Sequence, residues 1–313
     1  MQTVRTVTLP DRDLLAKLQP LPAGIEASVW DLKSVPEGID LEQIDGVVLP
    51  YIDASAVLGS LSKAPNLKFV QTQSTGFDGV REAAGPSAAV ASASGVHAAA
   101  TAELAIGLII AKLRGIDDAV RNQQTGSWLP QRRSSLADRR VLLVGVGGIG
   151  HEIARRLAPF EVEITRVGSS AREDSEGHIH ASSELAELAK THDVLVAVTP
   201  LNDHTHQLVD ATVLAALPDG ALVVNVGRGP VVDTAALTAE VVSGRLHCAL
   251  DVVDPEPLPA DHPLWTSPNA LITPHIGGNA SAFEPRIVRL LSAQLTALAN
   301  GERPANLVQA GPF

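Results

Sequence analysis

Three polar residues follow three apolar segments of the chain, and their side chains could do chemistry together. They are Arg228, Glu256 and His275, and the segments that precede them are ALVVNV, HCALDV and ALITP. If these segments are parallel strands of one sheet, their carboxyl ends lie at the same edge, where ligands bind in open α/β sheets. We therefore expect the three side chains to meet although they are far apart in the sequence.

The three residue types suit the addition of a hydride to the carbonyl group of a 2-oxo acid. The Arg228 guanidinium can hold the carboxylate of such an acid with two hydrogen bonds and polarise the neighbouring carbonyl group. The His275 imidazole can give a proton to the carbonyl oxygen, and a carboxylate beside it, Glu256, favours its protonated form. Each residue alone also has a structural explanation, as a turn, a solvated loop or a capped strand end.

A glycine motif indicates where a dinucleotide would bind. Gly145, Gly147 and Gly150 follow the GxGxxG spacing between an apolar strand, VLLVGV, and a helical segment, HEIARRLAP. Glycines at these positions allow a tight turn and a close approach of backbone N–H groups to a pyrophosphate at the positive end of the helix. The strand before the motif and the helix after it favour this interpretation over a turn without a ligand.

The end of the next strand predicts which dinucleotide binds. An acidic residue there would hold the 2′-hydroxyl group of the ribose in NAD. This chain has Gly168 at that end, followed by Ser169, Ser170 and Arg172, while Glu163 lies at the opposite end of the strand. Hydroxyl groups and a guanidinium suit a 2′-phosphate. The sequence thus favours NADP(H) within the NAD(P) class, the alternative being that Arg172 is a solvated loop residue.

The elements that position these residues alternate between strands and helices. In the first hundred residues, DGVVLP (45–50) and LKFVQTQ (67–73) predict buried strands around a helix with Asp53 as its N-cap. A long apolar helix is expected to run from residue 98 to near Gly126. From 141 to 280 the rhythm predicts one doubly wound domain, and an amphipathic helix after Ser281 is expected to close the chain.

Composition and charge exclude several other classes of protein. A net charge of −11 argues against a general nucleic-acid partner, which needs a basic face. A single cysteine, Cys248, allows no intrachain disulfide, and the polar beginning of the chain is unlike a signal peptide. The most apolar stretch (102–111) is too short to cross a membrane. We therefore expect a cytoplasmic protein with no membrane partner and no metal, since His204 and His206 have no further ligand residues nearby.

Several segments resemble the D-isomer-specific 2-hydroxyacid dehydrogenase family, which includes glyoxylate/hydroxypyruvate reductases and phosphoglycerate dehydrogenases. The similar segments are QSTGFD (73–78), VGVGGIG (144–150), TPLNDHTHQLV (199–209), NVGRGPVVD (225–233), ALDVVDPEPLPADHPLW (249–265) and TPHIGG (273–278). The resemblance implies an α/β fold of two Rossmann-like, doubly wound domains with parallel sheets and an active site in the cleft between them. The expected domains are 1–97 with 283–313, for the substrate, and 98–282, for the dinucleotide.

The resemblance also implies roles for single residues. Arg228 would bind a small 2-oxo or 2-hydroxy acid, His275 would be the acid/base catalyst and Glu256 its partner, while the backbone around Ser74, Thr75 and Gly76 would hold the substrate carboxylate. The expected cofactor-binding residues are Gly145, Gly147, Gly148, Ile149, Gly150, Ser169, Ser170, Arg172, Thr199, Pro200, Thr205, Val226, Gly227, Asp251 and Gly277. The resemblance further implies a homodimer formed through the cofactor domain.

Three residues depart from the family pattern. Gly148 replaces a common arginine near the pyrophosphate, Gly168 replaces the common aspartate, and His97 replaces a common asparagine. The roles of His97 and of Tyr51, which follows a strand end, stay open between lining the substrate cleft and packing. Two other functions also stay open: a non-catalytic sensor of dinucleotides, like the C-terminal binding protein corepressors, and a phosphite dehydrogenase.

Overall fold

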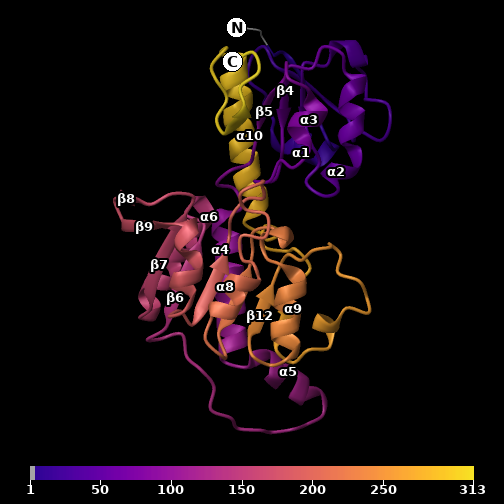
Figure 1. The fold of residues 1–313 in the computed structure, drawn as a ribbon. Helices are drawn as coiled ribbons and strands as arrows, with labels where there is room; N and C mark the ends of the chain where they lie inside the picture. Colours follow the sequence, from indigo (N-terminus) through magenta and orange to yellow (C-terminus); the bar gives the residue numbers. More distant parts are fainter. Residues whose placement is uncertain (1–3) are drawn as a thin grey trace. The chain divides into compact units, whose positions relative to one another are not determined.

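A computed structural model describes residues 4–313, which fold into two compact α/β units (Figure 1). Of the described residues, unit 1 comprises 4–97 and Ser281–Phe313, and unit 2 comprises Ala98–Ala280. Each unit is built around one sheet whose strands are mostly parallel, so the predicted α/β class with two such sheets is confirmed. No helix among the described residues is long and apolar enough to span a membrane.

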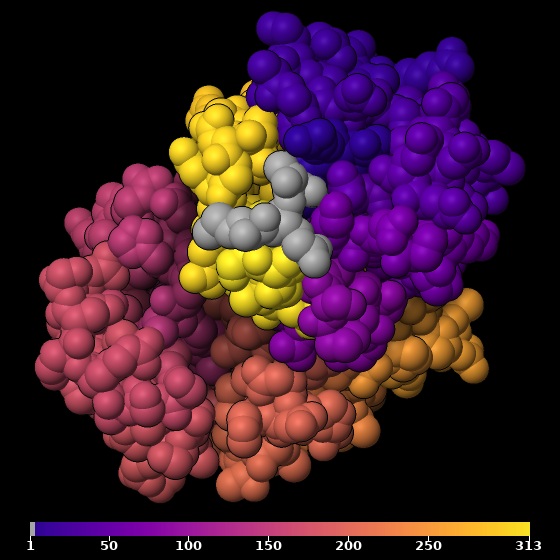
Figure 2. Space-filling view, turned by 90° about the horizontal axis from the view of Figure 1, so that it is seen from above, coloured from indigo at the N-terminus to yellow at the C-terminus, as the bar shows by residue number. Residues whose placement is uncertain are grey.

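The sheet of unit 1 has six strands in the order β14-β5-β4-β3-β1-β2, and only β14 runs antiparallel to its neighbour. The strands are β1 (Thr6–Leu9), β2 (Glu26–Val29), β3 (Gly46–Val48), β4 (Phe69–Gln71), β5 (Ala89–Ala91) and β14 (Leu307–Gln309). The helices are α1 (Arg12–Lys17), α2 (Ala54–Val57), α3 (Val80–Ala84) and α10 (Phe283–Ala299). Figure 2 shows the yellow C-terminal segment packed beside the indigo N-terminal residues of the same unit.

The sheet of unit 2 has eight strands in the order β13-β12-β11-β10-β6-β7-β9-β8, and only the edge strand β8 is antiparallel. The strands are β6 (Arg140–Val144), β7 (Glu163–Gly168), β8 (Arg172–Asp174), β9 (Gly177–Ala181), β10 (Val194–Ala197), β11 (Leu222–Asn225), β12 (His247–Leu250) and β13 (Ala270–Ile272). The helices are α4 (Ala98–Leu113), α5 (Ile116–Gln124), α6 (Gly148–Leu157), α7 (Leu185–Ala189), α8 (Ala211–Ala216) and α9 (Thr234–Val242).

Both faces of each sheet are buried, which explains why the strands read as continuous apolar runs. In β6, Leu142 and Val144 pack into a core with α7, α8 and α9, whereas Val141 and Leu143 pack into a core with α4 and α6. Successive side chains of a strand point to opposite faces, so one apolar run serves two cores. Unit 1 repeats this arrangement, with α1 and α10 on one face and α2 and α3 on the other.

Four details of the expected elements were wrong or missing. The long helix predicted to end near Gly126 ends at Leu113, because Gly115 adopts a left-handed conformation (φ 63°) from which α5 starts in a new direction. Asp53 precedes α2, but its φ of 57° takes its side chain away from the capping position and it makes no capping bond. The β8–β9 hairpin was not expected, and α10 does not close the chain, because β14 follows it and pairs with β5.

Candidate active site

The glycine motif forms the tight connection between β6 and α6. Gly145 has a φ of 117°, which side-chain-bearing residues rarely adopt. A Cβ atom at Gly150 would lie 1.9 Å from the carbonyl oxygen of Gly145, so only glycine lets the first turn of α6 pack against the strand end. The motif therefore takes the strand–turn–helix form that gives it meaning as a nucleotide loop.

The surroundings of this loop fit a dinucleotide. A Cβ atom at Gly147 or Gly148 would meet nothing within 4 Å, so the space in front of the helix N-terminus is open. Thr199, at the end of the neighbouring strand β10, has a buried hydroxyl oxygen with no hydrogen-bond partner among the described residues. Buried polar atoms are rarely left without a partner, and a bound ligand is one explanation of such an atom. Gly227 lies against this segment, since a Cβ there would lie 2.8 Å from the Thr199 carbonyl oxygen.

The end of β7 carries a guanidinium in the space that an aspartate side chain would need. A Cβ atom at Gly168 would lie 3.0 Å from Nη1 of Arg172 and 3.0 Å from a methyl carbon of Ile179. The same guanidinium nitrogen donates a hydrogen bond to the Ser170 carbonyl oxygen at 3.1 Å. Ser169, Ser170 and Arg172 are all exposed. Gly168 lies beside the glycine loop, since the same Cβ atom would lie 3.3 Å from a methyl carbon of Val146.

Other predicted cofactor residues lie on the loops after β10 and β11. The Thr205 hydroxyl group is used within its own loop, where it donates to the Pro200 carbonyl oxygen at 2.6 Å and accepts from the Asn202 amide at 2.8 Å. Val226 is buried under the turn that leads to Gly227, whereas Pro200 is exposed.

Arg228 is held by a turn that the sequence interpretation did not identify. The side chain of Asn225, which is 1% exposed, accepts a hydrogen bond from the Gly227 amide at 3.0 Å and donates one to the Arg228 carbonyl oxygen at 2.9 Å. Asn225 thus bridges both sides of the turn. The only sequence signal for this role is an amide side chain at the end of an otherwise apolar strand.

The Arg228 turn packs directly on the loop that carries Glu256. A Cβ atom at Gly229 would lie 1.9 Å from the carbonyl oxygen of Val253 and 2.9 Å from the Asp254 amide nitrogen. Only glycine permits this backbone contact. Gly229 therefore brings the turn that carries Arg228 into contact with the loop that carries Glu256.

Glu256 and His275 form a hydrogen-bonded pair. The Nδ1 atom of the His275 ring lies 2.6 Å from Oε1 of Glu256. This hydrogen bond raises the pKa of His275 above its ordinary value, although partial burial and the charge of Arg228 act in the opposite direction. The same bond lowers the pKa of Glu256. All three predicted catalytic groups therefore interact electrostatically, and Nε2 of His275 is the ring nitrogen that faces away from Glu256.

Asp251 fixes the loop that bears His275. Its carboxylate, buried with the residue at 3% exposure, accepts hydrogen bonds from the amides of Ile276 at 2.9 Å and Gly277 at 2.8 Å. Its own carbonyl oxygen accepts from the His275 amide at 2.9 Å. His275 has a φ of 51°, and these bonds hold it in this left-handed conformation. The resemblance implies that Asp251 lies behind the catalytic residues or on the nicotinamide side of the cofactor, and in this structure its carboxylate holds the loop that bears His275.

The His275–Glu256 pair predicts how the rate of reduction depends on pH. Proton donation needs the protonated imidazole, and a raised pKa keeps that form populated to higher pH. In Glu256→Gln the hydrogen-bonded carboxylate is lost, so the alkaline limb of the kcat/KM profile for carbonyl reduction should move to lower pH. A profile measured in both proteins checks this shift, and an alkaline limb that does not move would show that Glu256 leaves the His275 pKa unchanged.

In unit 1, the predicted substrate loop follows β4. The Ser74 hydroxyl donates to the Gly76 carbonyl oxygen at 2.6 Å, and the Ser74 carbonyl oxygen accepts from the Thr72 hydroxyl at 2.6 Å and from the Ala93 amide at 2.9 Å. These bonds make the loop a defined turn. The Thr75 hydroxyl oxygen is buried and has no hydrogen-bond partner among the described residues, which marks this turn as a place where a polar ligand could bind.

Three aromatic rings stack at the same edge of the unit 1 sheet. Tyr51 lies over Phe283, with ring centroids 4.2 Å apart, and the His97 ring is 5.4 Å from Tyr51 and 5.1 Å from Phe283. Nε2 of His97, which is 5% exposed, lies 2.7 Å from the carbonyl oxygen of Gln73, the residue before the substrate loop. Tyr51 and His97 therefore pack together beside this loop, and Phe283 was missed because its place depends on the distant helix α10.

Comparisons with known proteins agree with this geometry. Residues 106–277 match the family model described as "D-isomer specific 2-hydroxyacid dehydrogenase, NAD binding domain". The chain is 34% identical over 259 residues to a glyoxylate reductase of Thermofilum pendens, covering 79% of this chain and 76% of that one. It is 32% identical over 247 residues to the human glyoxylate reductase/hydroxypyruvate reductase, covering 76% and 75%.

Solved structures are similar over the whole chain. An NADPH-dependent glyoxylate/hydroxypyruvate reductase of Sinorhizobium meliloti, in complex with NADP and malonate, has a TM-score of 0.81 at 28% identity, with 100% of this chain and 98% of that one covered. A D-isomer specific 2-hydroxyacid dehydrogenase of Xanthobacter autotrophicus, in complex with NADPH and MES, has a TM-score of 0.82 at 27% identity, with 98% of each chain covered. The protein belongs to the D-isomer specific 2-hydroxyacid dehydrogenase family.

Proposed function

We propose that this protein reduces a small 2-oxo acid to the D-2-hydroxy acid with NAD(P)H, as a reductase of the glyoxylate and hydroxypyruvate type. The observation that carries the proposal is the His275–Glu256 pair, 2.6 Å apart, which shares one sheet edge with Arg228 and the glycine loop. The relatives named for glyoxylate and hydroxypyruvate reduction support this choice of substrate class.

Residues of unit 2 have separate roles in the proposed reaction. The bound cofactor supplies the hydride. His275 donates the proton from Nε2 to the carbonyl oxygen, while Glu256 stabilises the imidazolium and orients the ring through Nδ1. Arg228 binds the substrate carboxylate and polarises the carbonyl group that is reduced. In the reverse reaction, neutral His275 accepts the proton of the 2-hydroxy acid.

The residues around the glycine loop would hold the cofactor. The N–H groups at the start of α6 would bind the pyrophosphate, because the first N–H groups of a helix have no partner within the helix and its dipole favours an anion there. The Thr199 hydroxyl, buried and without a partner among the described residues, suits a polar group of the cofactor. In unit 1, the backbone of Ser74, Thr75 and Gly76 would hold the substrate carboxylate.

The cofactor is NADPH in preference to NADH. The guanidinium of Arg172 stands over Gly168, where a family aspartate would hold a ribose hydroxyl, and a 2′-phosphate pairs well with a guanidinium. We expect kcat/KM for NADPH to exceed that for NADH by about tenfold or more, an effect of ~1.4 kcal/mol. Arg172→Ala should reduce this ratio by raising the KM for NADPH, with little change for NADH. A wild-type preference for NADH would refute the assignment.

The protein also forms a homodimer through unit 2. The apolar side chains of α5 and of the segment that follows it are unusually exposed, at 53% for Val120, 92% for Trp128 and 60% for Leu129. A group of exposed apolar residues of this kind is typical of an interface. Sedimentation should give a dimer for the wild type and a monomer, or a weaker dimer, for Val120→Glu with Trp128→Glu. A wild-type monomer would exclude this assembly.

A further inference from the structure

The side chain of Arg166 is a charged group in a place where an apolar residue is expected. Arg166 lies in β7, between residues that belong to the sheet core, and its side chain is 9% exposed. Burying a guanidinium is costly unless it is paired and hydrogen-bonded. The partners of Arg166 should therefore reveal what the charge is used for.

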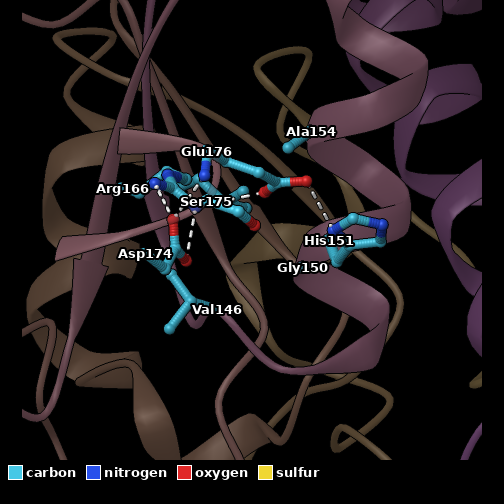
Figure 3. A pocket seen from close by; sticks show the side chains of 9 residues that line it. Val146, Gly150, His151, Ala154, Arg166, Asp174, Ser175 and Glu176 are labelled. Carbon is cyan, nitrogen blue, oxygen red and sulfur yellow. Dashed lines mark hydrogen bonds and ion pairs between the residues drawn. The ribbon is translucent and has the colours of Figure 1, made fainter. Parts of the chain in front are cut away.

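The Arg166 guanidinium donates four hydrogen bonds, and all of them go to the turn of the β8–β9 hairpin or to the residues beside it. Two join it to the Asp174 carboxylate, at 2.7 and 2.9 Å, one to Glu176 at 3.1 Å and one to the Gly177 carbonyl oxygen at 2.8 Å. Figure 3 shows the carboxylates of Asp174 and Glu176 converging on Arg166. The second oxygen of Glu176 also meets Nδ1 of His151, in the first turns of α6, at 2.9 Å.

Only the inner strand of the hairpin is joined to the rest of the sheet. β9 pairs in parallel with β7, whereas β8 is held by its pairing with β9 and by side-chain contacts such as that of Glu173 with His178. Strand β8 is three residues long, forms the edge of the sheet, and is exposed at every position. A short two-stranded hairpin is marginally stable without packing on one face. Ile179 of β9 supplies some packing, as it is 1% exposed. The bonds from Arg166 secure the opposite end of the hairpin, at the turn between β8 and β9.

This hairpin carries the residue that we assign to the 2′-phosphate. Arg172 is the first residue of β8, two positions before Asp174, so the two side chains lie on the same face of the sheet. On this face the two arginines cross strand β9 in opposite directions. Arg166 reaches outward to Asp174, and Arg172 reaches back over Gly168. If the turn were released, β8 could fray and Arg172 would lose its fixed position.

We propose that Arg166 is a positioning residue for cofactor selection, because it anchors the β8–β9 hairpin and thereby holds Arg172 over the end of β7. In this role Arg166 acts through the hairpin, since its guanidinium is bonded to two carboxylates and a carbonyl oxygen. The inference rests on the NADP(H) assignment above. It adds that the preference for NADPH depends on a buried side chain two residues before the strand end, as well as on the exposed arginine.

The test replaces Arg166 by methionine, which keeps an unbranched apolar stem in the strand but removes the anchor. We expect the KM for NADPH to rise about tenfold or more, while the KM for NADH and the kcat with either cofactor change little. Arg166→Lys keeps the charge but cannot bond two carboxylates in the same forked way, so it should give an intermediate ratio. Glu173→Gln is the matched control, because it removes a carboxylate of the same hairpin that pairs with His178 instead of Arg166.

A second readout separates anchoring from a general loss of stability. Amide hydrogen exchange in the peptide that contains residues 172–181 should become faster in Arg166→Met, while exchange in β6 and β10 stays as in the wild type. Equal exchange of this peptide in both proteins would overturn the anchoring role, whichever cofactor the enzyme prefers. Faster exchange with an unchanged NADPH/NADH ratio would overturn the role in cofactor selection. A wild-type preference for NADH would instead refute the NADP(H) assignment, and the exchange result would still decide the anchoring.

Discussion

Replacing His275 by asparagine should lower kcat for 2-oxo acid reduction by about 10²- to 10⁴-fold, which is the usual contribution of a general acid. Asparagine suits the test because it tolerates the left-handed backbone that His275 adopts at a φ of 51°. Its amide can still meet Glu256 but cannot give a proton to the substrate. Dinucleotide binding, measured by fluorescence titration, should stay close to that of the wild type because the glycine loop is unchanged.

A matched histidine elsewhere shows whether the effect is specific. His204 lies in an exposed loop of the same unit, and His204→Asn should leave kcat and the melting temperature unchanged. If His275→Asn also turned over at the wild-type rate, the imidazole would not be the acid. In that case the 2.6 Å contact between His275 and Glu256 would be structural only.

The second large effect is expected at Arg228. Removing one partner of a desolvated, hydrogen-bonded charge pair costs about 2–5 kcal/mol, so Arg228→Gln should reduce kcat/KM for a 2-oxo acid by roughly 30- to several-thousand-fold. Both KM and kcat should change, since the guanidinium binds the carboxylate and also polarises the carbonyl group. Arg228→Lys should recover only part of the loss, because an ammonium group does not match a carboxylate with two parallel bonds.

The Arg228 variants need a control for changes in the turn and for the loss of a positive charge. The Arg228 guanidinium donates one hydrogen bond to the turn, to the Gly227 carbonyl oxygen at 2.8 Å, and that bond is lost with it. The two bonds of the Asn225 side chain to Gly227 and Arg228 remain in the variants. Arg132→Gln, at an exposed arginine of the same unit, controls for the change of charge. A reduction in kcat/KM equal to that of Arg132→Gln would mean that Arg228 does not contact the substrate.

Much of the candidate site could be predicted from the sequence, because parallel strands place their carboxyl ends at one edge. Apolar runs followed by Arg228, Glu256 and His275 therefore predict a shared site without any knowledge of distances. The glycine loop is local as well, since the spacing of Gly145 and Gly150 reflects a single contact between a strand end and a helix turn. Such signals survive in one sequence because they depend on a few neighbouring residues.

Contacts between segments that are far apart in the chain could not be predicted from the sequence. The bonds of the Asp251 carboxylate to the amides of Ile276 and Gly277 depend on the pairing of β12 with β13, which a single sequence does not show. Its predicted role beside the cofactor stays a prediction. The β8–β9 hairpin was missed because its residues are mostly polar and show no clear alternation of apolar and polar side chains. It is held in part by a buried arginine of β7, a contact that the sequence does not reveal. Strand β14 was missed because an edge strand of three half-buried residues has no distinctive periodicity.

The most direct test of the whole account is steady-state turnover of the purified protein on a panel of 2-oxo acids with NADPH and with NADH. The panel should include glyoxylate, hydroxypyruvate, pyruvate and longer or aromatic 2-oxo acids, with phosphite assayed in the oxidative direction. The account predicts turnover of a small 2-oxo acid to the D-2-hydroxy product, faster with NADPH, and dependent on His275. Dinucleotide binding without turnover of any 2-oxo acid would instead indicate a dinucleotide sensor. Turnover of phosphite alone would indicate a phosphite dehydrogenase. Either result would contradict the proposed reaction.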